Sequence, residues 1–227
     1  VQDLCEKCSF EEVAFLILTK ELPNKSQLKR FKKQLDENRN ITINLKEIVK
    51  HMPKKSHPMD VARTIVSVLG LEDKETNNNS HEANMRKAIR IFSKTPTALA
   101  SFFRTRKNKK VIPPKKGLGF SENLFYMCFG KIPSKEIIKA FDVSLILYAE
   151  HSFNVSTFTA RTITSSLSDI HSAITGAIGS LKGPLHGGAN EEVMNMMVKI
   201  KKPENALKWI NTALDNKDVV MGFGHRV

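Results

Sequence analysis

A single histidine, His186, lies in the glycine-rich stretch that has the strongest chemical character in the sequence. Pro184 ends the preceding helix because it has no N–H and a fixed φ, whereas Gly187 and Gly188 allow a sharp turn close to a ligand. A helix is predicted over Asn190–Ile200, so His186 lies at or just before a helix N-terminus. The positive end of a helix dipole disfavours imidazolium. We therefore expect a neutral histidine that donates a hydrogen bond to a carbonyl oxygen; the alternative is a histidine that caps a helix–helix corner.

Two further histidines have a distinctive context. His151 ends an apolar helical pattern in Tyr-Ala-Glu-His, and His225 directly follows Gly222-Phe223-Gly224. Neither lies in an H-E-x-x-H zinc motif, and the sequence has no nucleophile elbow or P-loop. Glycine-flanked histidines beside backbone N–H groups suit the polarisation of a carbonyl oxygen. The sequence therefore predicts carbonyl chemistry without a metal site.

The chain is strongly basic, with 36 lysines and arginines against 23 acidic residues and a formal charge of +13. The densest basic run, residues 104–116, brackets two prolines and is predicted to be a solvated loop. It lacks interleaved aromatic residues and a recognition helix, so we expect no nucleic-acid partner. A basic nucleic-acid-binding module stays open as an alternative, since the same field could instead attract an anionic substrate.

Three cysteines, Cys5, Cys8 and Cys128, are too few for a secreted disulfide scaffold and suit a reducing compartment. Cys5 and Cys8 have the spacing of half a zinc site, but no second pair follows, so we predict buried thiols. No apolar run approaches the ~18 residues of a membrane span. We expect a cytoplasmic protein without a membrane partner.

The elements that position these residues are predicted to be helices, so the fold class is all-α. Helical patterns cover 4–19, 27–38 (capped by Ser26), 45–51, 59–69 (closed by Gly70), 82–93, 97–106, 133–151, a run from 157 past 174, 190–200 and 203–214. Loops are predicted at 73–80 and 107–119, and a short extended segment at 218–224. Met196 and Met197 are predicted to fill a core.

Several motifs resemble those of citrate synthases and 2-methylcitrate synthases. They occur in the family's order over the last hundred or so residues, which makes the match specific. The motifs are residues 147–161 (LYAEHSFNVSTFTAR), 167–170 (LSDI), 183–190 (GPLHGGAN) and 221–227 (MGFGHRV).

The resemblance implies a multi-helical homodimer, with residues 1–186 in a large helical domain and residues 187–227 beginning a small domain. It also implies an acyltransferase that condenses acetyl-CoA or propionyl-CoA with oxaloacetate and then hydrolyses the thioester. Acyl-CoA is a substrate, and no cofactor is bound permanently. The run from Phe153 to Arg161 favours 2-methylcitrate synthase slightly. A non-catalytic helical scaffold is a further alternative.

The resemblance also implies roles for individual residues. His186 corresponds to the histidine that hydrogen-bonds the thioester oxygen as the enol forms, and His225 to the one that polarises the oxaloacetate ketone. His151 corresponds to a third histidine, which binds oxaloacetate together with His225. The residues implied to line the CoA side of the cleft are Val219, Val220, Met221, Gly222 and Phe223.

The family's catalytic aspartate and a carboxylate-binding arginine in Asp-Pro-Arg context correspond to positions past Val227. We therefore expect the chain to be truncated on its C-terminal side and unable to turn over by itself.

Overall fold

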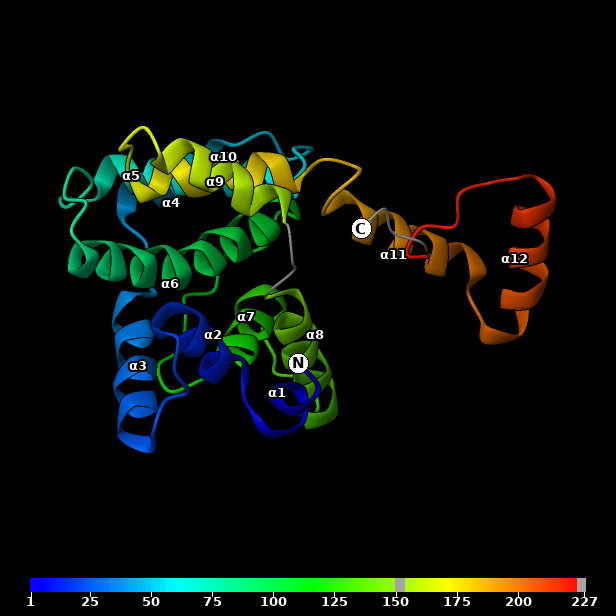
Figure 1. The fold of residues 1–227 in the computed structure, drawn as a ribbon, viewed down its shortest axis with the longest axis horizontal. Helices are drawn as coiled ribbons and strands as arrows, with labels where there is room; N and C mark the ends of the chain where they lie inside the picture. The colour runs from blue at the N-terminus through cyan, green and yellow to red at the C-terminus, as the bar shows by residue number, and fades with distance from the viewer. Residues whose placement is uncertain (150–153, 224–227) are drawn as a thin grey trace.

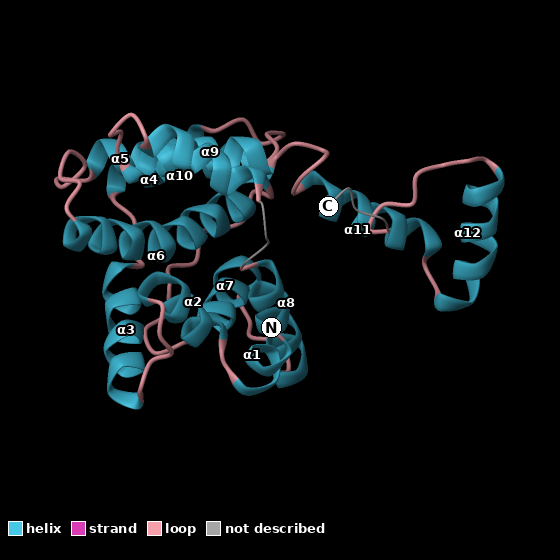
Figure 2. Cartoon of the chain, viewed as in Figure 1, coloured by secondary structure: helices cyan, strands magenta, loops and turns pink. Residues whose placement is uncertain are grey.

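The structure, a computed structural model, describes residues 1–149 and 154–223. Within that part it contains twelve α-helices, one 3₁₀ helix and no strand, which confirms the all-α prediction (Figure 2). The first six helices are α1 Gln2–Lys7, α2 Phe10–Thr19, α3 Lys25–Asn38, α4 Ile43–His51, α5 Pro58–Glu72 and α6 His81–Arg106. The others are α7 Phe120–Phe129, α8 Lys135–Tyr148, α9 Val155–Thr164, α10 Ile170–Leu181, α11 Gly188–Ile200 and α12 Ala206–Asp215, which the 3₁₀ helix Pro203–Asn205 precedes.

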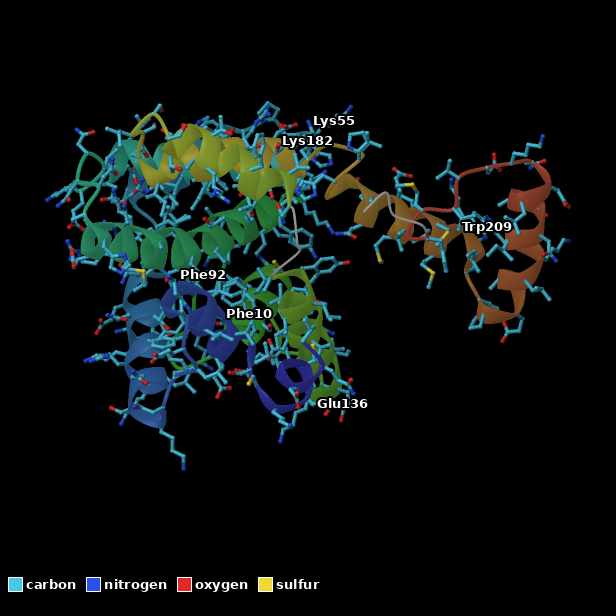
Figure 3. All side chains as sticks on the ribbon, viewed as in Figure 1. Phe10, Lys55, Phe92, Glu136, Lys182 and Trp209 are labelled. Carbon is cyan, nitrogen blue, oxygen red and sulfur yellow. The ribbon has the colours of Figure 1, made fainter. Side chains whose placement is uncertain are left out.

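The helices form a packed body from which the last two project (Figure 1). One layer contains α4, α5, α9 and α10, and α6 runs beneath it; α1 to α3, α7 and α8 lie on the other side of α6. The largest apolar cluster joins α4, α5 and α6 and is composed of Ile41, Leu45, Val49, Val61, Ile65, Val68, Leu69, Ala98 and Phe102. Phe10 and Phe92 connect α2 to α6 with ring centroids 5.8 Å apart (Figure 3). The body therefore has its own hydrophobic core.

Helices α9 and α10 are separate, whereas one helix was predicted from residue 157 past residue 174. The chain reverses after Thr164, where Leu167 adopts a left-handed φ of 64° and is 85% exposed. Asp169 then caps α10 by accepting a hydrogen bond from the Ser172 N–H. The prediction was wrong because the apolar spacing continues through the turn, while the Ser, Thr and Asp residues there bond locally to the backbone.

Small residues allow α10 to approach its neighbours closely. A Cβ added at Gly176 would lie 2.3 Å from the Ile163 side chain of α9. Gly70 was predicted to close α5, but it lies inside the helix, where an added Cβ would lie 2.9 Å from the Cβ of His171. Close approach of α10, rather than helix termination, explains this glycine.

Other boundaries also differ from the prediction. The segment 4–19 is two helices, because Ser9 and Glu12 form a capping box that begins α2. Asn24, not Ser26, caps α3. α6 continues through Pro96, where two helices were predicted, since buried residues on both sides of the proline hold it in the body.

The side chains of α11 are more exposed than predicted. Met197 is 57% exposed and Met196 is half-buried, so neither fills a core within the described residues.

Cys5 and Cys8 are free thiols that are half-buried against the Phe10 cluster rather than fully buried. Burial raises the pKa of the Cys8 thiol. Among the described residues, no helix is long and apolar enough to cross a membrane.

Candidate active site

The turn that carries His186 joins α10 to α11. The His186 N–H donates to the Gly183 carbonyl at 3.0 Å, and the Gly188 N–H donates to the same oxygen at 3.1 Å. α11 then begins at Gly188, two residues earlier than predicted. His186 thus lies directly before a helix N-terminus, as the sequence indicated.

Gly187 is required by the tightness of this turn. A Cβ at this position would lie 2.5 Å from the backbone oxygen of Leu181, and backbone cannot move aside as a side-chain end can. A Cβ on Gly188 would lie 3.0 Å from the Gly183 oxygen. The two glycines therefore allow the chain to return onto the end of α10, which fixes the backbone of His186.

The first N–H groups of α11 do not form an open anion site. The Gly188 N–H is bonded within the turn, the Ala189 N–H donates to the His186 carbonyl at 3.3 Å, and the Asn190 N–H to the Gly187 carbonyl at 3.2 Å. α11 therefore acts on the His186 ring through its dipole rather than through these N–H groups.

A different helix contacts the imidazole directly. The Ser156 backbone N–H, in the first turn of α9, donates to His186 Nε2 at 3.3 Å, and the Ser156 hydroxyl lies 3.0 Å from the same nitrogen. Asn154 caps α9, and its side-chain oxygen accepts from the Thr157 N–H and from the Ser156 hydroxyl. The half-buried His186 ring is thereby oriented by a capped helix N-terminus.

The backbone contact defines one state of the ring. With the Ser156 N–H as donor, Nε2 accepts and carries no proton, which places the proton of the neutral ring on Nδ1; the Ser156 hydroxyl then gives its proton to Asn154 and makes no hydrogen bond to the ring. In this state Nδ1 is the donor nitrogen, and the neutral donor histidine expected from the sequence stays a prediction. The sequence indicated Ser156 only as a helix cap; its backbone N–H is a partner of His186 through a contact across thirty positions.

The segment expected to line the CoA side of the cleft lies against α11. Gly222 has φ of 90°, and a Cβ there would lie 3.0 Å from a methyl carbon of Val193 on α11. Val219 and Phe223 are 81% and 71% exposed, whereas Val220 and Met221 are half-buried. One helix therefore connects the His186 turn with this exposed, partly apolar segment. His151 and His225 lie outside the described residues.

No group of three or more potential metal ligands occurs in the described ranges 1–149 and 154–223. One partner of the His186 ring is the Ser156 backbone N–H. The chemistry that this arrangement supports is hydrogen-bond donation from a fixed, neutral imidazole to an oxygen that gains negative charge.

Comparison with known proteins identifies the family of this chain. The family model "Citrate synthase, C-terminal domain" matches residues 1–227. The chain is 48% identical to the citrate synthase of Mycolicibacterium smegmatis over 227 residues, which are all of this chain and 60% of that protein. It is 47% identical to the 2-methylcitrate synthase of Mycobacterium tuberculosis, again over the whole chain and 57% of that protein.

Solved structures agree with the fold. The citrate synthase of Pyrobaculum aerophilum superposes with a TM-score of 0.90 at 32% identity, covering 100% of this chain and 58% of that one. A ternary complex of carboxymethyl coenzyme A and oxaloacetate with the citrate synthase of Thermoplasma acidophilum superposes with a TM-score of 0.87 at 29% identity. That match covers 99% of this chain and 59% of the other.

The all-helical architecture is thus that of the citrate synthase fold. The chain belongs to the citrate synthase family. It spans about 60% of the length of the relatives it matches. Both citrate synthases and 2-methylcitrate synthases occur among these relatives, so similarity alone does not select an acyl group.

Proposed function

We propose that the complete gene product condenses an acyl-CoA with oxaloacetate and hydrolyses the resulting thioester. The observation that supports this proposal best is the His186 ring, which α9 and the glycine turn hold with Nε2 as an acceptor. Its Nδ1–H donates to the thioester oxygen while a base removes a proton from the neighbouring carbon. The donor stabilises the negative charge that develops on that oxygen, so it acts mainly in the transition state.

The remaining steps follow from the reaction. The enol carbon of the acyl-CoA forms a bond to the ketone carbon of oxaloacetate, whose oxygen takes up a proton. Water then cleaves the thioester and releases the CoA thiol and a tricarboxylic acid. In this proposal His225 polarises the ketone, His151 and His225 hold oxaloacetate, and an aspartate past Val227 is the base.

CoA is proposed to bind along residues 219–223 on the side of α11. The exposed Val219 and Phe223 offer apolar surface there, and backbone groups between them offer hydrogen bonds.

We place the domain boundary at residues 186 and 187, since α11 and α12 project from the body directly after this point (Figure 1). CoA and oxaloacetate are substrates, so no resident cofactor is needed.

A homodimer is part of the proposal. Val155 and Phe158 on α9 are 52% and 71% exposed, which leaves an apolar strip on the body for a second copy of the chain. Phe158→Asp is expected to convert a dimer into a monomer in light scattering after gel filtration. A dimer that tolerates this change would rule out the strip as the interface.

A CoA-release assay on the complete gene product, with oxaloacetate and either acetyl-CoA or propionyl-CoA, tests the function. One methyl group in a pocket is worth only about 1–3 kcal/mol, so activity with both thioesters is expected. We expect propionyl-CoA to have the higher kcat/KM, which makes the enzyme a 2-methylcitrate synthase. Inactivity with both thioesters would overturn the proposal.

A further inference from the structure

The N-terminus of α5 contacts the His186 turn on both of its sides. Asp60 accepts a hydrogen bond from Lys182 Nζ at 2.7 Å, four residues before His186. His57 Nε2 lies 2.9 Å from a carboxylate oxygen of Glu191, five residues after His186. Figure 3 shows Lys182 where the chain leaves the layer of α5 and α10 toward α11. One short stretch of α5, distant in sequence, therefore holds both flanks of the turn.

The contact of His57 has a defined direction. His57 is the N-cap residue of α5, and its Nδ1 accepts the Met59 N–H at 3.2 Å. Since Nδ1 is an acceptor, Nε2 carries the ring proton and donates it to Glu191. Glu191 belongs to the first turn of α11, where the helix dipole also favours a carboxylate. The bond therefore fixes the beginning of α11 to α5.

The contact of Asp60 holds the other flank. Lys182 follows the last residue of α10, and its side chain is only partly exposed, at 38%, as is the side chain of Asp60, at 30%. The hydrogen bond from Lys182 is the main cause that lowers the pKa of Asp60. Arg63 Nη2 also lies 3.0 Å from Asp60, but it belongs to α5 itself and does not reach the turn.

α5 is a rigid support for these two contacts. Pro58 occupies its first turn, and Val61 and Ile65, which follow Asp60 on the helix, are 2% and 0% exposed. Because α5 is packed into the core, contacts from its N-terminus hold the turn at a fixed position relative to the body. α9 fixes the His186 ring, and α5 fixes the backbone on each side of it.

We propose that His57 and Asp60 are positioning residues for His186, acting through Glu191 and Lys182. Neither touches the reacting atoms in this proposal, which rests on the proposed function of His186 as a donor. Loss of either contact lets the turn shift relative to α9, and a displacement of about 1 Å at a reacting group can cost up to about a hundredfold in rate.

The first test is kinetic and uses the complete gene product. Lys182→Met and Glu191→Met remove one contact each, because methionine offers neither an ammonium donor nor an oxygen acceptor, and they leave the α5 cap in place. We expect each to lower kcat by about 3- to 30-fold without changing the KM for oxaloacetate, since only the alignment of the donor changes. The charge-exchanged pair Asp60→Lys with Lys182→Asp is expected to restore part of the rate. Arg63→Gln is the matched control and should match the wild type.

The second test separates this inference from the proposed function. Hydrogen exchange of the Gly188 and Ala189 amides is measured on the complete gene product, whether or not it has condensing activity. The Lys182→Met/Glu191→Met double variant is expected to exchange these amides at least about tenfold faster, while Arg63→Gln leaves them unchanged. Unchanged exchange in the double variant, or a changed KM for oxaloacetate with kcat intact, would overturn the positioning role.

Discussion

The packed body and the projecting α11–α12 segment contain similar apolar patterns but bury them very differently. In α5, Ile65 and Val66 are 0% exposed, whereas Met197 and Val198 of α11 are 57% and 70% exposed. α11 has no fully buried residue, and in α12 only Ala213 is buried. An amphipathic pattern thus predicts a helix, but it does not determine whether that helix finds a core partner.

The packed body therefore provides most of the stability of the fold, whereas the proposed chemistry lies where the body meets α11. The body is held by its own core, and α11 is held to it by specific polar contacts on either side of His186. A site at such a junction can be altered without unfolding the body. Substitutions in the two regions should therefore differ in what they change.

The largest difference between the two regions is expected from a pair of side-chain truncations, one in the body and one in α11. Ile65→Ala in α5 is expected to lower the free energy of unfolding by about 2–5 kcal/mol, because it opens a cavity in the largest cluster. Met197→Ala in α11 should change it by less than about 0.5 kcal/mol, because the side chain is exposed. Urea unfolding followed by circular dichroism measures both; equal losses would contradict the distinction between the regions.

At the junction, His186→Ala should affect the rate rather than stability. Removing a preorganised donor to a developing oxyanion costs about 10²–10³-fold in kcat. Because His225 and His151 are proposed to hold oxaloacetate, its KM should change little. The matched control, His51→Ala, removes a surface histidine that is 73% exposed. A near-normal kcat for His186→Ala would refute the donor role.

Helix packing in the body gives an intermediate effect. Gly70→Ala places a methyl group 2.9 Å from His171 Cβ, close to the α10 backbone, so we expect a loss of about 1–3 kcal/mol. Gly179→Ala on α10 meets nothing within 4 Å and should stabilise the helix by about 0.5–1 kcal/mol. Thermal melts of the two variants should shift in opposite directions. Shifts in the same direction would mean that the α5–α10 contact is looser than described.

These contrasts also show what the sequence could predict. Local signals were sufficient for the all-α class, for the loops at 73–80 and 107–119, and for the turn at His186. They failed at Leu167 and Pro96, where the balance between local bonding and core packing decides whether a helix continues. Capping residues were confused where two candidates lie close together, as at Asn24 and Ser26.

The site was only partly predictable for a related reason. The glycines around His186 are visible in the sequence because the turn is local. The residues that contact this turn are distant in sequence. Ser156 lies on α9, and His57 and Asp60 lie at the N-terminus of α5, so only the fold brings them to the turn. No periodicity encodes such long-range contacts. Residue spacing indicated which histidine to consider, and tertiary packing determined which of its nitrogens donates.

The smallest expected effect concerns a carboxylate at the edge of the body. Hydrogen bonds and charges from Arg86, the main cause, and Arg90 lower the pKa of Glu75 from 4.5 to about 2. A carboxylate with a lowered folded-state pKa stabilises the fold above its unfolded pKa and loses that contribution as the pH falls. Glu75→Gln should therefore lower the melting temperature at pH 7, and its difference from the wild type should shrink between about pH 4.5 and 2.

Glu37→Gln is the control for this pH series, because Glu37 lies 3.8 Å from Lys33 in an exposed pair. Exposed pairs of this kind contribute little, so its melting temperature should follow the wild type at every pH. Glu75 also connects the loop after α5 to α6 through both arginines, which exposed i,i+4 pairs do not do. If the Glu75→Gln difference stayed constant as the pH fell, its effect would come from packing of the loop and not from the ion pairs.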